Sequence, residues 1–168
     1  FKLDGYIIPK NDEFFGEYVP KHKDRLQYIT NFSGSYGFAI ILKSKNLLFV
    51  DGRYTLQAKI QSGKKFKILT IPKHFPSHIL KKDRLKIGFD PKIHTKQGLA
   101  KIFQQTACKL VPVDRNLVDK IWIRKNNFLF KKFYTLPKNA FGQSYKQKIK
   151  KIIEILRKLK FDSQFISS

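Results

Sequence analysis

Short apolar runs, each closed by a proline, a glycine or a polar turn, are the feature that most constrains the fold of this chain. Six of them have the length of a buried strand and are too short for a buried helix. They are residues 5–9 (GYIIP), 38–42 (FAIIL), 47–50 (LLFV), 66–71 (FKILTI), 85–89 (LKIGF) and 110–113 (LVPV). Longer segments with helical spacing separate most of these runs. Strands that alternate with helices indicate an α/β architecture.

Four segments between the runs carry helical signals. They are residues 23–30, 51–63, 95–107 and 116–122. Asp51 and Thr95 are good first caps, because their side-chain oxygens can accept hydrogen bonds from the free amides of a first turn. In the last of these helices four apolar side chains are expected to face inward: Leu117, Val118, Ile121 and Trp122. Residues 74–85 contain a proline and predict a weak helix or a loop.

The connections between the runs predict a mixed sheet. Residues 43–46 form a polar link of hairpin length, which pairs its two strands antiparallel. Strand–helix–strand units pair their strands parallel, so both kinds of pairing are expected. Pro112 cannot donate to a ladder, and its strand is therefore expected at an edge or a bulge. The predicted fold class is an α/β domain with a mixed sheet.

The last part of the chain is predicted to begin a second domain. Residues 1–123 are expected to form the first domain, 124–141 a linker, and 142–168 the first helix and strand of a truncated second domain. Residues 144–160 form a helix with a capping box and an apolar stripe, and residues 161–166 are expected to begin a strand. The stripe consists of Ile149, Ile152, Ile153, Leu156 and Leu159. We expect this stripe to pack on the first domain or on another copy of the chain.

The formal net charge of +23 allows two interpretations. A basic surface could bind nucleic acid or an anionic membrane. A coding bias toward Lys, Ile, Phe, Tyr and Asn would also raise the charge without creating a patch. The lysines are scattered in pairs along the chain, which favours the coding bias and makes a nucleic-acid partner the weaker expectation. The basic and aromatic residues 124–134 (RKNNFLFKKFY) could contact single strands, but a surface linker is the preferred interpretation.

Cysteine use and hydropathy indicate where the protein works. The single Cys108 cannot form an internal disulfide, which is typical of a reducing, cytoplasmic setting. No apolar stretch approaches the roughly 18 residues needed to cross a bilayer, so no membrane association is expected. The chain begins at Phe1 and contains no methionine, so we expect the native start to be removed or to lie upstream.

The residues that usually carry catalysis do not form a recognisable site in this sequence. The four histidines lie outside any metal-ligand spacing, and they are His22, His74, His78 and His94. The sequence contains no nucleophile elbow and no phosphate-binding glycine loop. The 12 acidic residues do not pair into an acid–base dyad. No catalytic residue and no metal ligand is therefore predicted within this chain.

Residues 51–54 (DGRY) form the sharpest local motif, at the end of a predicted strand and the start of a helix. Asp51 can cap the helix, Gly52 permits a tight turn, and Arg53 is a bidentate donor for a carboxylate. Two interpretations remain open for the last two residues. Arg53 and Tyr54 could project toward a partner or a peptide, or they could pair with an acid and pack in the core. The second interpretation is preferred.

Several motifs in chain order resemble the N-terminal domain of the aminopeptidase P and prolidase family. They are EYVP (17–20) with Arg25, FSGS (32–35) with Gly37, VDGRY (50–54) with Gln57 and Ala58, IGFDP (87–91), VPV (111–113) with NLVDKIW (116–122), and Gly142 with Ser144 and Lys148. The segment that ends at Trp122 resembles the long, three-domain aminopeptidases P. One departure is local: Arg124 is followed by Lys125, where that family tends to have Arg-Pro.

The resemblance implies a fold, an activity and an assembly. The fold is an α/β/α sandwich of the creatinase N-terminal type, which is ribonuclease H-like, with Asp51, Gly52, Asp90, Pro91 and Trp122 as structural motif residues. The parent would be a homodimeric aminopeptidase that removes the residue before proline. It would use two divalent ions, usually manganese, held by two Asp, one His and two Glu beyond this chain. Arg53 and Tyr54 are the candidates for an interface or for substrate access.

Two other functions remain open beside an aminopeptidase fragment. The chain could be a non-catalytic binding module whose basic surface contacts nucleic acid, since domains similar to these peptidases also occur in histone chaperones. It could also be the N-terminal domain of a prolidase-like enzyme, although NLVDKIW (116–122) argues against this.

Overall fold

The computed structural model describes residues 2–124, 132 and 134–166. The chain divides into two compact units, Phe1–Lys125 and Asn126–Ser168, and each is described by itself. Most of the basic and aromatic segment 124–134 lies outside the described residues.

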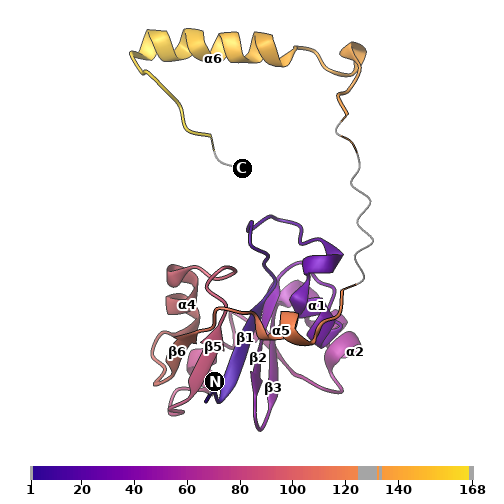
Figure 1. The fold of residues 1–168 in the computed structure, drawn as a ribbon, viewed down its shortest axis with the longest axis vertical. Coiled ribbons are helices and arrows are strands. Elements are labelled where there is room, and N and C mark those ends of the chain that lie inside the picture. Colours follow the sequence, from indigo (N-terminus) through magenta and orange to yellow (C-terminus); the bar gives the residue numbers. More distant parts are fainter. Residues whose placement is uncertain (1, 125–131, 133, 167–168) are drawn as a thin grey trace. The chain divides into compact units, whose positions relative to one another are not determined.

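The first unit is built on a six-stranded mixed sheet with the strand order β4-β3-β2-β1-β5-β6 (Figure 1). The strands are β1 (Gly5–Pro9), β2 (Gly37–Leu42), β3 (Asn46–Asp51), β4 (Lys67–Ile71), β5 (Lys86–Phe89) and β6 (Lys109–Pro112). β2 is antiparallel to both of its neighbours, whereas the other neighbouring pairs are parallel. The six predicted strands and the mixed sheet are confirmed. Pro112 lies on the edge strand β6, as its missing amide donor predicts.

Five short α-helices and two 3-10 turns lie between the strands of this unit or, for the last helix, after them. They are η1 (Lys21–Lys23), α1 (Arg25–Thr30), η2 (Gly52–Tyr54), α2 (Thr55–Ser62), α3 (Pro76–Ile79), α4 (Lys96–Phe103) and α5 (Leu117–Ile121). Side-chain caps set several of the starts. Asp24 accepts from the amide of Gln27, and Thr95 accepts from the amide of Gly98. The α-helices are shorter than the sequence pattern predicts; α4, for example, ends at Phe103 and not at residue 107.

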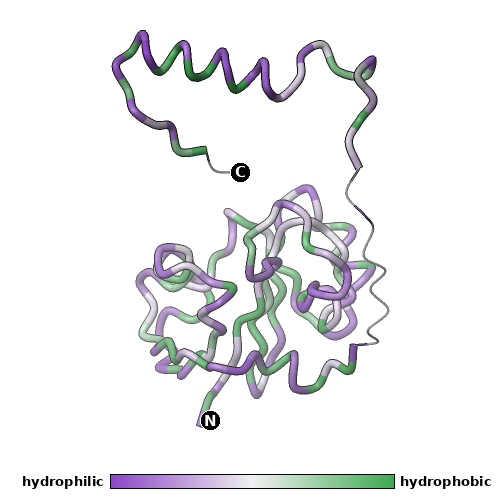
Figure 2. The backbone as a smooth tube through the Cα atoms, turned by 45° about the horizontal axis from the view of Figure 1, so that its top comes forward, coloured by the Kyte–Doolittle hydropathy of each residue, from purple (hydrophilic) through white to green (hydrophobic). Residues whose placement is uncertain are grey.

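The core lies on both faces of the sheet, because successive side chains of a strand point to opposite sides. On one face Ile8, Leu48 and Val50 pack with Leu26 of α1, Ala58 of α2 and Val118 of α5. On the other face Ile7, Ile40 and Phe49 pack with Leu80 and with Leu99 and Phe103 of α4. Figure 2 shows hydrophobic strands at the centre of this unit. The result is the three-layer α/β/α arrangement that was expected.

The expected inward face of α5 is only partly correct. Val118 is buried, and Leu117 and Trp122 pack against the core from partly buried positions. Ile121, however, is 62% exposed, which contradicts the prediction. The helix ends at Ile121, and Trp122 already has an extended backbone, so these four residues do not form one continuous helical face.

The second unit contains η3 (Lys138–Ala140) and the helix α6 (Tyr145–Leu159). Ser144 and Gln147 form the predicted capping box. The strand expected at residues 161–166 is absent from the structure, because the described part of this unit offers no strand to pair with. No residue of α6 is buried, and Ile149 is 51% exposed, so the described residues of this unit do not cover the apolar stripe; its packing on the first domain or on another copy stays a prediction. Among the described residues no helix combines the length and apolar character needed to span a bilayer.

Candidate functional site at the carboxyl edge of the sheet

Five of the six strands point the same way, so their carboxyl ends meet at one edge of the sheet. We call this the carboxyl edge; it is formed by the residues that end β1, β3, β4, β5 and β6. In open α/β sheets this edge is where ligands and partners usually bind. The motif that begins at Asp51 lies here, at the end of β3, and Asp90 follows the end of β5. The structure therefore places the motif at residues 51–54 and the motif that contains Asp90 at the same edge of the sheet.

The turn at Asp51 presents a fixed arginine to solvent. Oδ1 of Asp51 accepts hydrogen bonds from the backbone amide and from Nε of Arg53, each at 2.9 Å. The side chain of Arg53 is 73% exposed. Hydrogen bonds from the Arg53 side chain and amide lower the pKa of Asp51, and the same contact raises the pKa of Arg53. Arg53 therefore stays charged, and its direction is held by its own turn.

Tyr54 faces the protein, in contrast to Arg53. Its hydroxyl lies 2.8 Å from Oγ of Ser35, and its ring meets Phe32 edge-on at a centroid distance of 5.8 Å. The amide of Gln61 donates to Oγ of Ser33 at 2.9 Å, which ties the same loop to α2. Tyr54 thus positions the loop that precedes β2, while the exposed surface of this motif belongs to Arg53.

A cleft of about 450 Å³ opens at the carboxyl edge beside this loop. Its walls come from the segment after β1, from the start of β2, from the end of β4 and from α4. Phe15, Tyr36 and Phe75 line it, and no carboxylate is among its lining residues. Phe15 and Tyr36 are 46% and 55% exposed. These aromatic residues were not predicted from the sequence, although aromatic side chains in polar, turn-rich segments are a signal that could have identified them.

Asp90 has a structural role at the same edge. Only 3% of it is exposed, and it accepts hydrogen bonds from the amide of Lys92 and from Nδ2 of Asn116, each at 2.8 Å. Asn116 in turn caps α5, so this pair joins the end of β5 to the start of α5. The neighbouring Pro91 is exposed and starts the turn. His94 lies against the cleft, and burial lowers the pKa of its imidazole below the ordinary value.

A network of charges joins α1, α5 and the loop after β1, and the sequence did not predict it. Arg25, only 4% exposed, donates two hydrogen bonds of 2.8 Å to Asp119 and one of 2.7 Å to Glu13. Arg124 also pairs with Asp119 and lies 4.5 Å from the ring of Trp122. Partial burial would raise the pKa of Glu13, but hydrogen bonds from its own amide and from Arg25 lower it to about 2.

Trp122 contacts two side chains, Arg124 and Tyr28. Arg124 lies over one part of the indole, and Tyr28 of α1 stacks on the ring at a centroid distance of 4.6 Å and an angle of 13°. The residue therefore fixes α5 against α1, which is consistent with a structural place in its motif. Among the described residues no group of three His, Cys, Asp or Glu side chains could hold a metal ion.

Comparison with known proteins identifies relatives for almost the whole chain. The creatinase/prolidase N-terminal domain profile matches residues 2–121. A probable Xaa-Pro aminopeptidase P of Coprinopsis cinerea is 34% identical over 94% of this chain and 27% of the relative. An aminopeptidase P1 of Lotus japonicus is 33% identical over 88% of this chain and 24% of the relative. The chain thus spans about a quarter of the length of these relatives.

Solved structures show the same fold. The X-prolyl aminopeptidase of Caenorhabditis elegans, described as a cytosolic enzyme with a di-nuclear active site, matches with a TM-score of 0.72 and 25% identity. That match covers 94% of this chain and 27% of the enzyme. The N-terminal domain of a cytoplasmic peptidase from Mycobacterium tuberculosis matches with a TM-score of 0.53 and 22% identity, over 71% of this chain and 88% of that domain.

Proposed function

Because the chain belongs to the creatinase/prolidase N-terminal domain family, we propose that it is the non-catalytic N-terminal part of an Xaa-Pro aminopeptidase. The observation that carries this proposal is the match of 94% of the chain to about a quarter of the Caenorhabditis elegans enzyme. The parent protein would remove the N-terminal residue that precedes proline. Its reaction would take place in the part of the enzyme that follows this chain.

The metal ions of the parent belong to that remaining part. The related enzyme has a di-nuclear active site, and a divalent metal pair can lower the pKa of a bridging water to produce a nucleophile. The residues described here do not fit such a centre, because they include no group of three metal-binding side chains. We therefore assign no metal to this chain and propose two divalent ions, with manganese as the first ion to test, in the parent enzyme.

The carboxyl edge supplies the contact function of the unit. Arg53 is exposed, charged and fixed in direction by Asp51, as a contact to a carboxylate requires. In the proposed homodimer this edge faces the partner or the entrance used by peptides with proline in second position. The cleft lined by Tyr36 and Phe75 adds an apolar surface next to it. The proposed location of the enzyme is the cytoplasm, where the Caenorhabditis elegans relative works.

The assignment of the chemistry is tested by comparing this chain with the full-length parent. Both are incubated with manganese and a peptide that carries proline in second position, and the released amino acid is measured. We expect turnover by the parent and none by the 168-residue chain. Calorimetry with manganese should show two bound ions per parent and no stoichiometric binding to this chain. Turnover by the chain alone would overturn the proposal.

The contact function is tested in the full-length parent with Arg53→Ala. We expect a change in KM or in the dimer dissociation constant, while the metal content stays the same. Lys59→Ala is the matched control, because Lys59 is also exposed and cationic but lies on α2, outside the turn at Asp51. Equal kinetics and equal dimerisation of Arg53→Ala, Lys59→Ala and the wild type would exclude a contact role for Arg53.

A further inference from the structure

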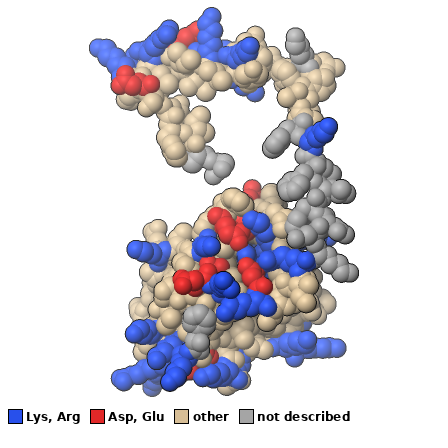
Figure 3. Space-filling model, in the orientation of Figure 1, with Lys and Arg blue, Asp and Glu red and all other residues tan. Residues whose placement is uncertain are grey.

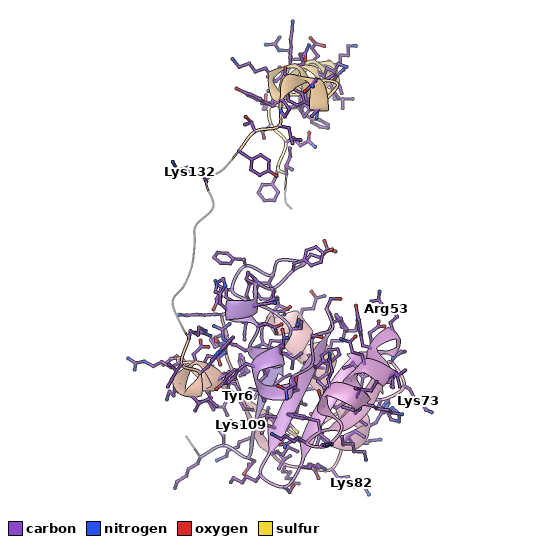
Figure 4. All side chains as sticks on the ribbon, turned by 90° about the vertical axis from the view of Figure 1, so that its right-hand side faces the viewer. Tyr6, Arg53, Lys73, Lys82, Lys109 and Lys132 are labelled. Carbon is purple, nitrogen blue, oxygen red and sulfur yellow. The ribbon has the colours of Figure 1, made fainter. Side chains whose placement is uncertain are left out.

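The amino ends of the parallel strands carry a second surface, opposite the carboxyl edge. We call it the basic edge and define it by eleven side chains: Lys2, Lys43, Lys45, Lys64, Lys65, Lys67, Lys81, Lys82, Arg84, Lys86 and Lys109. All of them are exposed. Figure 3 shows basic side chains projecting at the lower end of the first unit, and in Figure 4 Lys82 lies toward the end away from Arg53.

Topology brings these residues together although they are scattered along the sequence. Lys43 and Lys45 lie in the β2–β3 turn, and the other pairs lie in the turns that enter the parallel strands. Residue Lys67 is the register partner of Leu47 at the start of β3. Lys86 and Lys109 are register partners at the starts of β5 and β6. Two like charges in such positions oppose each other and cost the fold stability, which an anionic partner would relieve.

The charges of the basic edge are almost unpaired. Among the described residues, Lys43 is the one of these eleven cations with an ion-pair partner, Asp4, at 3.2 Å. Asp83 is the one other carboxylate among these turns. Five cations of the first unit outside this edge pair with a carboxylate: Lys10, Lys23, Arg25, Arg53 and Arg124. The basic edge therefore gathers eleven exposed cations around two carboxylates, Asp4 and Asp83, so most of its positive charge is not compensated by the described residues.

The shape and composition of this edge indicate the kind of anion that fits. Six strands at a spacing of about 4.8 Å spread the cations over roughly 24 Å. Phosphates along one strand of a duplex repeat at about 3.4 Å, so the row can follow several of them. Among the described residues of these turns, no large apolar side chain is exposed. Aromatic stacking of single strands and apolar insertion into a membrane therefore have no support here.

We propose that the basic edge binds the phosphate backbone of duplex nucleic acid without reading its sequence. The contacts are charge–charge contacts from lysines to phosphate oxygens, which position a duplex but do not specify bases. Binding releases the counterions condensed on the duplex, so affinity falls steeply as salt rises. Because the duplex binds the folded chain and its phosphates offset the repulsion between lysines such as Lys86 and Lys109, it also raises the unfolding temperature.

The test compares two variants of the whole chain with equal charge loss. The edge variant carries Lys64→Gln, Lys65→Gln, Lys82→Gln and Lys109→Gln. The control variant carries Lys21→Gln, Lys59→Gln, Lys92→Gln and Lys96→Gln, all exposed and outside the basic edge. Fluorescence anisotropy measures binding to labelled DNA and RNA duplexes of about 20 base pairs between roughly 50 and 200 mM KCl. Circular dichroism checks that each variant keeps the fold.

We expect the edge variant to lose at least about tenfold in affinity and to reduce the salt slope by about 0.9 for each lysine that contacts a phosphate. The control variant should lose less than about threefold, since its lysines touch no phosphate. Equal binding of DNA and RNA identifies the shared phosphate backbone, and stronger binding of RNA identifies RNA as the partner; both support the proposal. Equal losses in the two variants, or binding to phosphatidylserine vesicles but to neither duplex, overturn it.

Discussion

Replacing Arg25 by methionine tests whether the buried charge network holds α1, α5 and the loop after β1 together. The guanidinium is 4% exposed and serves Asp119 and Glu13 at the same time. Methionine keeps an apolar stem of similar length, so the packing of that stem is largely retained. The variant therefore removes the charge and its hydrogen bonds and little else.

The magnitude follows from the exposure of the partners. Removing one member of a buried ion pair costs about 3–5 kcal/mol, because the other charge is left without compensation. Here the side chains of Glu13 and Asp119 are 32% and 29% exposed, so water compensates part of the loss. Lys23 and Arg124 also remain as second partners. We expect the free energy of unfolding to fall by about 2–4 kcal/mol.

Urea unfolding followed by tryptophan fluorescence measures this loss. Trp122 is the single tryptophan, and it stacks on Tyr28 beside the network, so its emission reports on the contact between α1 and α5. Lys23→Met is the control, since Lys23 also pairs with Glu13 but is more exposed; it should cost less than about 1 kcal/mol. A loss below about 1 kcal/mol for Arg25→Met, or one equal to the control, would refute the reasoning.

Three further predictions concern pH and two single residues. The pKa of Glu13 is about 2 in the fold against an ordinary 4.5, so the stability that this carboxylate contributes is present above pH 4.5 and is lost toward pH 2. The urea midpoints measured at pH 4.5 and pH 2 should therefore differ more in wild type than in Arg25→Met, and equal differences would contradict the role of Arg25. Asn116→Ala removes the cap of α5 and a hydrogen-bond partner of the buried Asp90. It should lower the free energy of unfolding by about 2–3 kcal/mol in urea titrations, and a loss below about 0.5 kcal/mol would count against the role of Asn116 in joining β5 to α5. Gly37→Ala would put Cβ 2.7 Å from a carbonyl oxygen of β3, whereas the Cβ of Gly142→Ala meets nothing within 4 Å. In thermal unfolding the free energy of unfolding should fall by about 1–3 kcal/mol for Gly37→Ala and stay unchanged for Gly142→Ala, and equal melting temperatures would refute the clash.

The strands could be predicted from the sequence because each is a short apolar run, and the central strands β1, β2 and β3 are buried on both faces. Helix ends were less predictable. The apolar spacing after Thr95 continues toward residue 107, yet α4 ends at Phe103, and Gln105 adopts a positive φ of 59°. A propensity pattern cannot show such a turn, because tertiary contacts decide where a short helix stops. The apolar stripe of α6 predicts a partner surface, which the described residues of its own unit do not supply.

The candidate site was only partly predictable for a related reason. The turn at Asp51 is local, so its cap and its exposed arginine can be inferred from four consecutive residues. The pair of Arg25 and Asp119 joins residues 94 positions apart, and the cleft combines segments from four parts of the chain. Opposite charges in a sequence do not say which of them meet. Only the strand order brings these partners together.

Loop length explains why more cations pair with carboxylates at the carboxyl edge of the sheet than at the basic edge. At the carboxyl end the chain after β1 is long enough to bring Glu13 to Arg25 and Asp24 to Lys10. At the amino end the turns, such as the one at residues 43–45, are short and reach few carboxylates. Neighbouring strands are about 4.8 Å apart, which is less than the screening length of about 8 Å at physiological salt. The fields of adjacent lysines therefore add, and the charge that the sequence scatters in pairs acts in the folded chain as one surface.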